Sequence, residues 1–160
     1  CVSENSARFK TIVAPLLPHV DTLLANDFEA EKLTTIELGR GEALDRGAVA
    51  RAARALIDLG VRQWSVLHFP EGACACSRGG EIVWQPSVRV PPADIAGSNG
   101  AGDALAAGLL YGLHEDWPMP RALELGVCAA AASLYHPSCS EAVKPADECL
   151  ALGRKLGFRE

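Results

Sequence analysis

The order of apolar segments between residues 20 and 69 limits the possible folds more than any other feature of this sequence. Apolar runs typical of buried strands alternate there with segments that have helical spacing. In chain order these are a strand at 20–25, a helical turn at 27–32, a helix at 45–59 and a strand at 64–69. Strands that alternate with helices predict βαβ units, so we expect an α/β fold with a mostly parallel sheet covered by helices.

The remaining segments add helices on both sides of this region and one hairpin. They are a helix at 6–17 that Pro18 stops, short strands at 73–77 and 81–85, and helices at 101–113, 121–135 and 146–156. The turn Arg78-Gly79-Gly80 between the two short strands predicts the hairpin. Because the helix at 101–113 is apolar on nearly every face, we expect it to be buried.

Composition and charge narrow the range of functions. The chain has 160 residues, of which 49% are hydrophobic and 22% are charged, as expected for one globular domain with an apolar core. A net charge of -5 provides no basic field for phosphate backbones or anionic lipids. No apolar run approaches the ~20 residues of a membrane span. We therefore expect a cytoplasmic protein that binds neither nucleic acid nor membranes.

The cysteines and the first residue carry weaker information. The six cysteines are scattered, and several lie in apolar contexts where Cys acts as a small hydrophobic residue. We therefore expect neither a disulfide framework nor a zinc site. The chain begins at Cys1 rather than at a methionine, and we interpret it as a fragment of a longer protein.

The segment Gly100-Ala101-Gly102-Asp103 lies where an irregular loop enters the apolar helix at 101–113. Its glycines let backbone N–H groups approach a ligand closely, and the helix N-terminus adds a partial positive charge. This combination favours binding of an anion such as phosphate. Asp103 falls in the first helical turn, where a carboxylate is also a common capping residue, so a purely structural interpretation remains open.

Three segments together resemble the ribokinase-like (PfkB) carbohydrate kinases. SNGAGDALAAGLLYGL, residues 98–113, is similar to the C-terminal signature of that family. LLPHVDTLLANDFEAEKLT, residues 16–34, resembles its strand that ends in an Asn-x-x-Glu motif, and CAAAASLYHPSCSEA, residues 128–142, resembles its alanine-rich helix and following loop. The resemblance covers nearly the whole chain. Family members usually have about twice this length, which implies that an N-terminal half with the lid and most sugar contacts is missing.

The resemblance implies a fold and a catalytic residue. It implies a three-layer α/β/α sandwich, with residues 1–160 forming its C-terminal ATP-binding and catalytic portion. Asp103 would be the base that removes a proton from the acceptor hydroxyl, and Gly100, Ala101 and Gly102 would form an anion hole for the transferred phosphoryl group. Both roles suit phosphoryl transfer, which depends on positioning and charge stabilisation. Asn99 would also belong to the nucleotide-binding residues.

The resemblance implies further cofactor contacts. Asn26 and Glu29 match positions that organise Mg²⁺ and its waters around the phosphates of ATP, which suits the oxygen ligands that Mg²⁺ prefers. An asparagine followed by acidic residues after a strand is also an ordinary helix cap, so this alternative stays open. Gly72 matches a family glycine near the phosphates, and His136 lies in the loop that relatives place near adenine.

Two positions depart from the family pattern. Relatives often have a Thr-x-Gly turn where this chain has His68-Phe69-Pro70-Glu71-Gly72, and Pro70 has no N–H group to donate to a phosphate. Many relatives also bind a monovalent cation with an aspartate at the position of Gly97, and Asp94 lies three residues too early to replace it. A monovalent cation site is therefore not supported.

These observations lead to one principal hypothesis and two alternatives. The principal hypothesis is an ATP- and Mg²⁺-dependent kinase that phosphorylates a hydroxyl of a small sugar or sugar-like substrate, and a homodimer is compatible with it. A non-catalytic nucleotide- or sugar-binding relative is the first alternative. An unrelated Rossmann-type domain is the second, and it is disfavoured because no GxGxxG follows an early strand.

Overall fold

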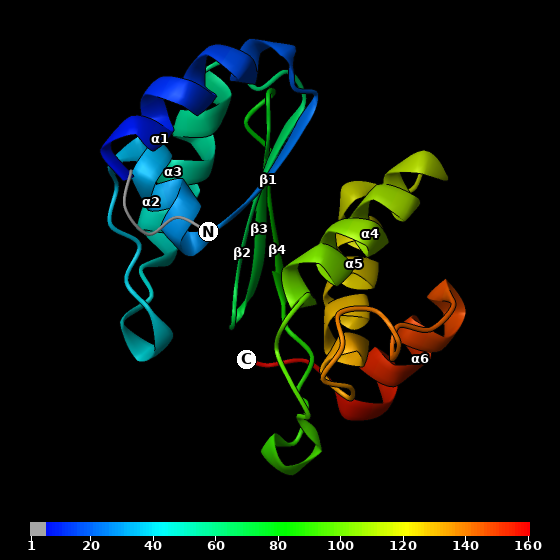
Figure 1. Cartoon of the computed structure of the whole chain (residues 1–160). Coiled ribbons are helices and arrows are strands. Elements are labelled where there is room, and N and C mark those ends of the chain that lie inside the picture. Colours follow the sequence, from blue (N-terminus) through cyan, green and yellow to red (C-terminus); the bar gives the residue numbers. More distant parts are fainter. Residues whose placement is uncertain (1–5) are drawn as a thin grey trace. The chain divides into compact units, whose positions relative to one another are not determined.

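The computed structural model describes residues 6–160 (Figure 1). Its helices are α1 (Ser6–Val13), α2 (Asp27–Thr34), α3 (Arg46–Asp58), α4 (Ala101–His114), α5 (Met119–Ser133) and α6 (Ala146–Leu156), with 3₁₀ helices η1 (Ala14–His19), η2 (Gly41–Ala43) and η3 (Pro92–Asp94). Its strands are β1 (Thr22–Asn26), β2 (Trp64–Phe69), β3 (Gly72–Ser77) and β4 (Ile82–Pro86). Two compact units divide the chain: the first extends to Phe69 and includes Cys74–Val83, and the second holds Pro70–Ala73 and Trp84–Glu160.

The four strands form one sheet in the order β1-β2-β3-β4. Strands β1 and β2 are parallel, with Asn26 opposite His68. Two residues connect β2 to its neighbour β3, a link that only antiparallel strands can make, and β4 follows after another short turn. The predicted α/β class and hairpin are confirmed. The sheet of this portion is mixed, because short turns join three of its strands.

The first unit is built around buried aliphatic side chains from α2, α3, β2 and the segments between them. Leu33, Leu56 and Val66 are among its fully buried residues. The Ser65 hydroxyl donates a hydrogen bond to the Ala53 carbonyl at 2.6 Å and so ties β2 to α3. Gly60 follows the end of α3 with φ +124°, which confirms the helix end predicted there.

The predicted helix at 6–17 is shorter than expected. The α-helix α1 ends at Val13 and continues as the 3₁₀ helix η1, which contains Pro15 and Pro18. A proline has no N–H group, so it cannot supply the hydrogen bonds that a regular α-helix needs. No helix within residues 6–160 has both the length and the apolar character required to cross a membrane.

Helices α4 and α5 of the second unit pack backbone against backbone. A Cβ atom added at Gly108 would lie 2.9 Å from the Leu125 carbonyl oxygen, and one added at Gly112 would lie 2.8 Å from the Ala122 Cα. The prediction that α4 is buried is confirmed for the face that packs against α5 and is wrong for the face of Leu110 and Tyr111, which are 51% and 47% exposed. In the described part of the chain, α4 buries the face that carries its glycines and leaves these two side chains in solvent.

Candidate active site

The turn at Gly100 requires glycine for two independent reasons. Gly100 is the N-cap residue of α4 and has left-handed backbone angles, with φ +81° and ψ 0°. A Cβ atom at this position would also lie 2.7 Å from the Cys139 Cα and 2.9 Å from the Cys139 carbonyl oxygen. Any other residue would therefore strain the backbone and push away the loop that contains Cys139.

That loop, residues 136–141, lies directly against the loop that leads into α4. The Ala96 N–H donates to the Leu134 carbonyl at 2.8 Å, and a Cβ atom at Gly97 would lie 3.1 Å from the Pro137 Cα. The two segments also interact electrostatically, because partial burial and, next, the negative charge of Asp94 raise the pKa of Tyr135. The fold therefore brings the segment that begins at His136 together with the glycine turn, although about 35 residues separate them in the sequence.

Asp103 is the third residue of α4, and its side chain is exposed. Within residues 6–160 its carboxylate makes no hydrogen bond or ion pair, and no side chain caps the N-terminus of α4. The capping role that the sequence left open for Asp103 is therefore not observed. Its carboxylate is free to contact a ligand.

The backbone amides of the turn are only partly available to an anion. The Ala101 N–H points to the Ser98 carbonyl at a long 3.3 Å, and the first helical bond runs from the Ala104 N–H to the Gly100 carbonyl at 2.8 Å. The N–H groups of Gly102 and Asp103 have no partner in the described part of the chain, as expected in the first turn of a helix. The Asp103 amide is a candidate anion donor that the motif did not single out. Asn99 is exposed beside these groups.

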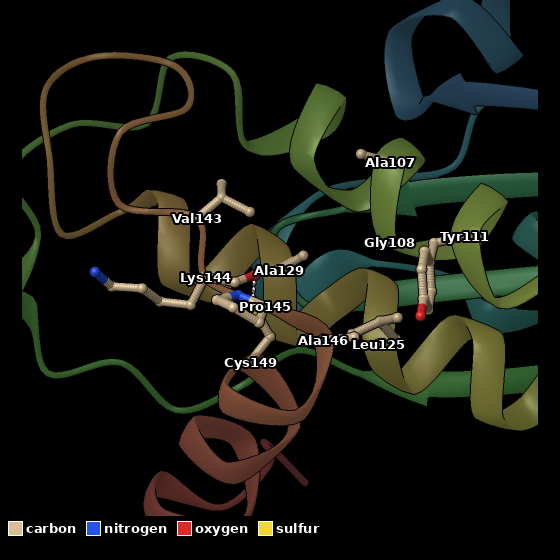
Figure 2. A pocket seen from close by; sticks show the side chains of 10 residues that line it. All are labelled: Ala107, Gly108, Tyr111, Leu125, Ala129, Val143, Lys144, Pro145, Ala146 and Cys149. Atoms are coloured by element: carbon tan, nitrogen blue, oxygen red, sulfur yellow. Dashed lines mark hydrogen bonds between the residues drawn. The ribbon is translucent and has the colours of Figure 1, made fainter.

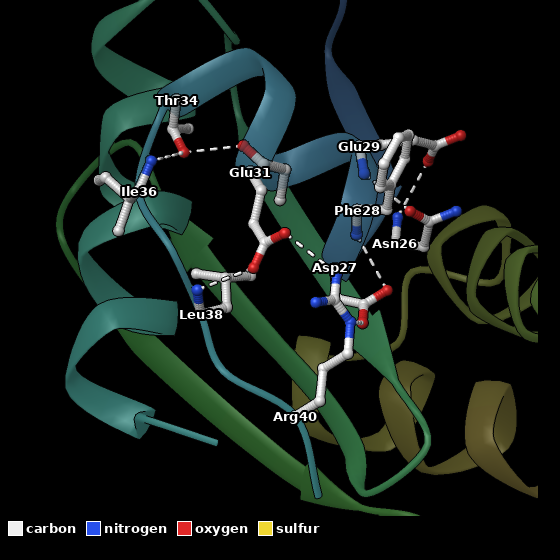
Figure 3. Close-up of polar contacts among 10 residues, drawn as sticks. Asn26, Asp27, Phe28, Glu29, Glu31, Thr34, Ile36, Leu38 and Arg40 are labelled. Atoms are coloured by element: carbon white, nitrogen blue, oxygen red, sulfur yellow. Dashed lines mark hydrogen bonds and ion pairs between the residues drawn. The ribbon is translucent and has the colours of Figure 1, made fainter. Parts of the chain in front are cut away.

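Asn26 and Glu29 belong to the first unit, at the junction of β1 and α2, and they form a capping box (Figure 3). The Glu29 N–H donates to Asn26 Oδ1 at 2.8 Å, and the Asn26 N–H donates to Glu29 Oε2 at 3.0 Å. The capping role considered for this motif is thus present. The capping box uses Asn26 Oδ1 and Glu29 Oε2 as acceptors. It leaves Glu29 Oε1 without a partner among residues 6–160.

Arg40 occupies the other two carboxylates of α2, and no sequence pattern indicated this contact (Figure 3). Its Nε donates to Asp27 Oδ2 and its Nη2 to Glu31 Oε2, both at 3.0 Å. The hydrogen bond that Arg40 donates to Glu31, together with the negative charges of Glu31 and Asp27, raises the pKa of Arg40. Asp27 Oδ1 accepts from the Phe28 N–H, and Glu31 Oε1 accepts from the Leu38 N–H. Among the α2 carboxylates of the described chain, an oxygen without a partner remains only on Glu29.

This donor set fits an ion that takes few protein ligands. No cluster of three or more His, Cys, Asp or Glu residues suitable for a metal occurs in the described range 6–160. Mg²⁺ usually keeps several waters and binds through one or two carboxylates together with substrate phosphates. The free oxygen of Glu29 meets that requirement without a preformed protein cage.

Gly72 is the first residue of β3, directly after the turn that follows β2, and close packing explains the glycine. A Cβ atom at Gly72 would collide with the Gln85 carbonyl oxygen and lie 3.0 Å from the Pro86 Cα. Ser87 fixes the same turn, since its hydroxyl donates to the Pro70 carbonyl at 2.8 Å and its N–H to the Glu71 carbonyl at 2.9 Å. Glu71 Oε2 is buried and has no hydrogen-bond partner in the described residues.

A cavity of about 380 Å³ lies between α4, α5 and the segment that enters α6 (Figure 2). It is lined mainly by apolar side chains, including Ala107 and Leu125, and Lys144 extends away from it. The Cys149 thiol at its edge donates to the Lys144 carbonyl at 3.2 Å. No residue of the glycine turn lines this cavity, and it presents no charged group to a phosphate.

Solved structures share this fold. A putative sugar kinase from Clostridium perfringens superposes with a TM-score of 0.76 at 18% identity, covering 97% of this chain and 46% of that chain. A ribokinase from Arabidopsis thaliana, solved with ribose and ATP, gives a TM-score of 0.74 at 20% identity, covering 91% of this chain and 44% of that chain. The fold is that of the ribokinase-like kinases.

The sequence places the chain within this class more narrowly. The model of the pfkB family carbohydrate kinases matches residues 2–146, and the chain belongs to that family. A 5-dehydro-2-deoxygluconokinase from Geobacillus kaustophilus is 33% identical over 131 residues, which cover 77% of this chain and 38% of that protein. Another from Clostridium tetani is 40% identical over 83 residues, covering 52% of this chain and 24% of that protein. The chain thus spans less than half the length of these relatives.

Proposed function

We propose that this chain is the ATP-binding, catalytic portion of a carbohydrate kinase, which transfers the γ-phosphoryl group of ATP to a hydroxyl of a sugar-like acceptor. One observation carries the proposal. The first turn of α4 combines an exposed, unpaired Asp103 carboxylate with unpaired N–H groups at Gly102 and Asp103. A proton acceptor and a turn suited to an anion therefore lie within three residues of each other, on a helix that packs closely against α5.

Asp103 would act as the general base. It would accept the proton of the acceptor hydroxyl while that oxygen attacks the γ-phosphorus. The turn from Gly100 to Asp103 and the positive end of the α4 dipole would stabilise the charge on the transferred phosphoryl oxygens. Ala101 contributes less to this anion hole than its neighbours, because its N–H is directed to the Ser98 carbonyl.

Glu29 and Asn26 would hold Mg²⁺ and its waters near the nucleotide phosphates. When bound, Mg²⁺ neutralises charge on those phosphates. Glu29 would contribute its unpaired Oε1, while the capping box fixes the orientation of its side chain. Asn99 and Gly72 are assigned to the surroundings of the phosphates, and His136 to the loop that flanks the nucleotide.

The acceptor class follows from the named relatives. The curated relatives at 31–40% identity include several 5-dehydro-2-deoxygluconokinases, so we assign a keto-deoxy sugar acid as the acceptor. Residues outside this chain would supply most contacts to that acceptor, since the relatives are more than twice as long. A homodimer of the complete protein remains part of the proposal.

The test is an ATP-coupled assay of the complete protein with 5-dehydro-2-deoxygluconate and other sugar acids. Asp103→Asn should lower kcat at least about 100-fold, the loss expected when a general base is removed. Its melting temperature should fall by no more than about 4 °C, because the carboxylate makes no hydrogen bond or ion pair and interacts only with the α4 dipole. Wild-type protein that binds ATP but phosphorylates no acceptor would favour the non-catalytic alternative. Equal kcat values in both proteins would refute Asp103 as the base.

A further inference from the structure

His136 uses both of its ring nitrogens within its own loop. The Ser138 N–H donates to His136 Nδ1 at 3.1 Å. A backbone N–H can only donate, so Nδ1 must be the unprotonated nitrogen and Nε2 must carry the ring proton. That proton is directed to Glu141 Oε2, at an Nε2–Oε2 distance of 3.2 Å. The imidazole therefore bridges Ser138 and Glu141.

The remaining donors close this bridge into a ring. The Glu141 N–H donates to Ser138 Oγ at 3.4 Å, and Ser138 Oγ lies 2.7 Å from His136 Nδ1, where its hydroxyl proton finds an acceptor. Glu141 is thus held at both its backbone and its carboxylate. Each of the three residues both donates and accepts within the ring, and Ser138 donates twice to His136 Nδ1, through its N–H and its hydroxyl. These contacts fix the conformation of the loop from 136 to 141.

This loop is the surface against which the glycine turn is packed. The Cys139 backbone lies 2.7–2.9 Å from the place where a Gly100 Cβ would be, and the Pro137 Cα lies 3.1 Å from the corresponding point at Gly97. With so little space, Pro137 and Cys139 cannot move towards the turn without displacing it. The position of the loop consequently limits the positions that the turn and its free amides can take.

We propose that Glu141, His136 and Ser138 form a brace that positions the Gly100–Asp103 turn for phosphate binding, with Glu141 as its key positioning residue. The inference rests on the proposed kinase function, because the phosphate is that of the bound nucleotide. It also redefines the part played by His136. With both ring nitrogens occupied, His136 acts on the nucleotide through the loop and not by hydrogen bonding to the base.

Three variants of the complete protein test the brace. Glu141→Ala removes the acceptor for His136 Nε2–H and should raise the KM for ATP about three- to tenfold, the effect of one net hydrogen bond, while kcat changes less than about twofold. Glu141→Gln keeps a carbonyl oxygen at this position and should restore most of the affinity. Glu115→Ala is the matched control, because Glu115 is an exposed glutamate of the same unit whose carboxylate makes no bond to any described residue.

A spectroscopic measurement examines the brace independently of activity. Long-range ¹H–¹⁵N NMR should detect the Nε2–H tautomer of His136, and an Nδ1–H tautomer would overturn the proposal. Amide hydrogen exchange at Ala104, whose N–H donates to the Gly100 carbonyl at 2.8 Å, should become faster in Glu141→Ala and stay unchanged in Glu115→Ala.

The outcomes separate the brace from the kinase function. If wild-type protein binds ATP and Glu141→Ala binds it equally well, the brace is refuted and the kinase proposal survives. If wild-type protein binds no ATP, the kinase proposal fails, and equal exchange in wild type and Glu141→Ala would then refute the brace as well.

Discussion

Asn26 and Glu29 are joined by two reciprocal hydrogen bonds across the first turn of α2. The side chain of each accepts from the backbone N–H of the other, at 2.8 Å and 3.0 Å. This reciprocal contact satisfies two N–H groups that the start of a helix leaves without partners. It also means that both side chains have a structural role, whatever ligand they bind. A substitution that tests the proposed Mg²⁺ role must therefore preserve the capping box.

Glu29→Gln meets that condition. Glutamine also forms capping boxes, so the free energy of unfolding should change by no more than about 0.3 kcal/mol. The melting temperature should then change by no more than about 1 °C. The free Oε1 loses its negative charge, so the Mg²⁺ concentration needed for half-maximal activity should rise. Titration of Mg²⁺ at fixed ATP measures this shift. Asn26→Ala is the contrasting variant, because loss of the cap should lower the free energy of unfolding by about 0.5–2 kcal/mol.

Gly108→Ala should destabilise the second unit by about 1–3 kcal/mol, the usual effect of overpacking a tight interface. The added methyl group would lie 2.9–3.1 Å from backbone atoms of Leu125 and Gly126, which cannot rotate away as a side chain would. Chemical denaturation measures the change. Gly79→Ala is the control, because its methyl group would meet only Ser77 Oγ at 3.6 Å. Equal stability of the two variants would contradict the close packing of α4 against α5.

Cys139 should react with iodoacetamide much faster than the other cysteines of the described chain. It is exposed, whereas Cys74, Cys76, Cys128 and Cys149 are buried. Burial also raises the pKa of the Cys74 thiol to about 12, which suppresses the reactive thiolate. Peptide mapping after brief alkylation identifies the modified residue. Because Cys139 packs against Gly100, ATP should slow its alkylation, and rapid labelling of Cys74 would contradict the described core.

Cys128 should make the fold less stable in alkali. Burial, and next the charge of Glu124, raise the pKa of this thiol to about 12, above the ~8.5 of an unfolded chain. Its stabilising contribution is therefore complete below pH 8.5 and is lost as the pH rises towards 12, by at most about 1.4 kcal/mol per pH unit. Denaturation curves between pH 8 and 10.5 should show a shallower decline for Cys128→Ala than for wild type.

Much of the secondary structure could be predicted because it depends on neighbouring residues. The strand at 64–69 and the helix at 146–156 occur with the predicted bounds, since apolar periodicity and turn residues act locally. The helix start at Gly100 could be predicted for the same reason, whereas the role of residues 100–103 as a site stays a prediction. The burial of α4 could not, because apolar composition does not reveal which helix faces find a partner.

The α/β class, the order of the elements, the family and the residues of the glycine turn can be read from the sequence, because they depend on local patterns and motifs. Tertiary packing sets which groups of that turn are free, brings Arg40 to the carboxylates of Asp27 and Glu31, and lets Glu141 close a ring with His136 and Ser138. Arg40 and the loop that supports the turn reach their partners through irregular segments. Where such segments meet depends on how the helices pack, and residue spacing does not encode it.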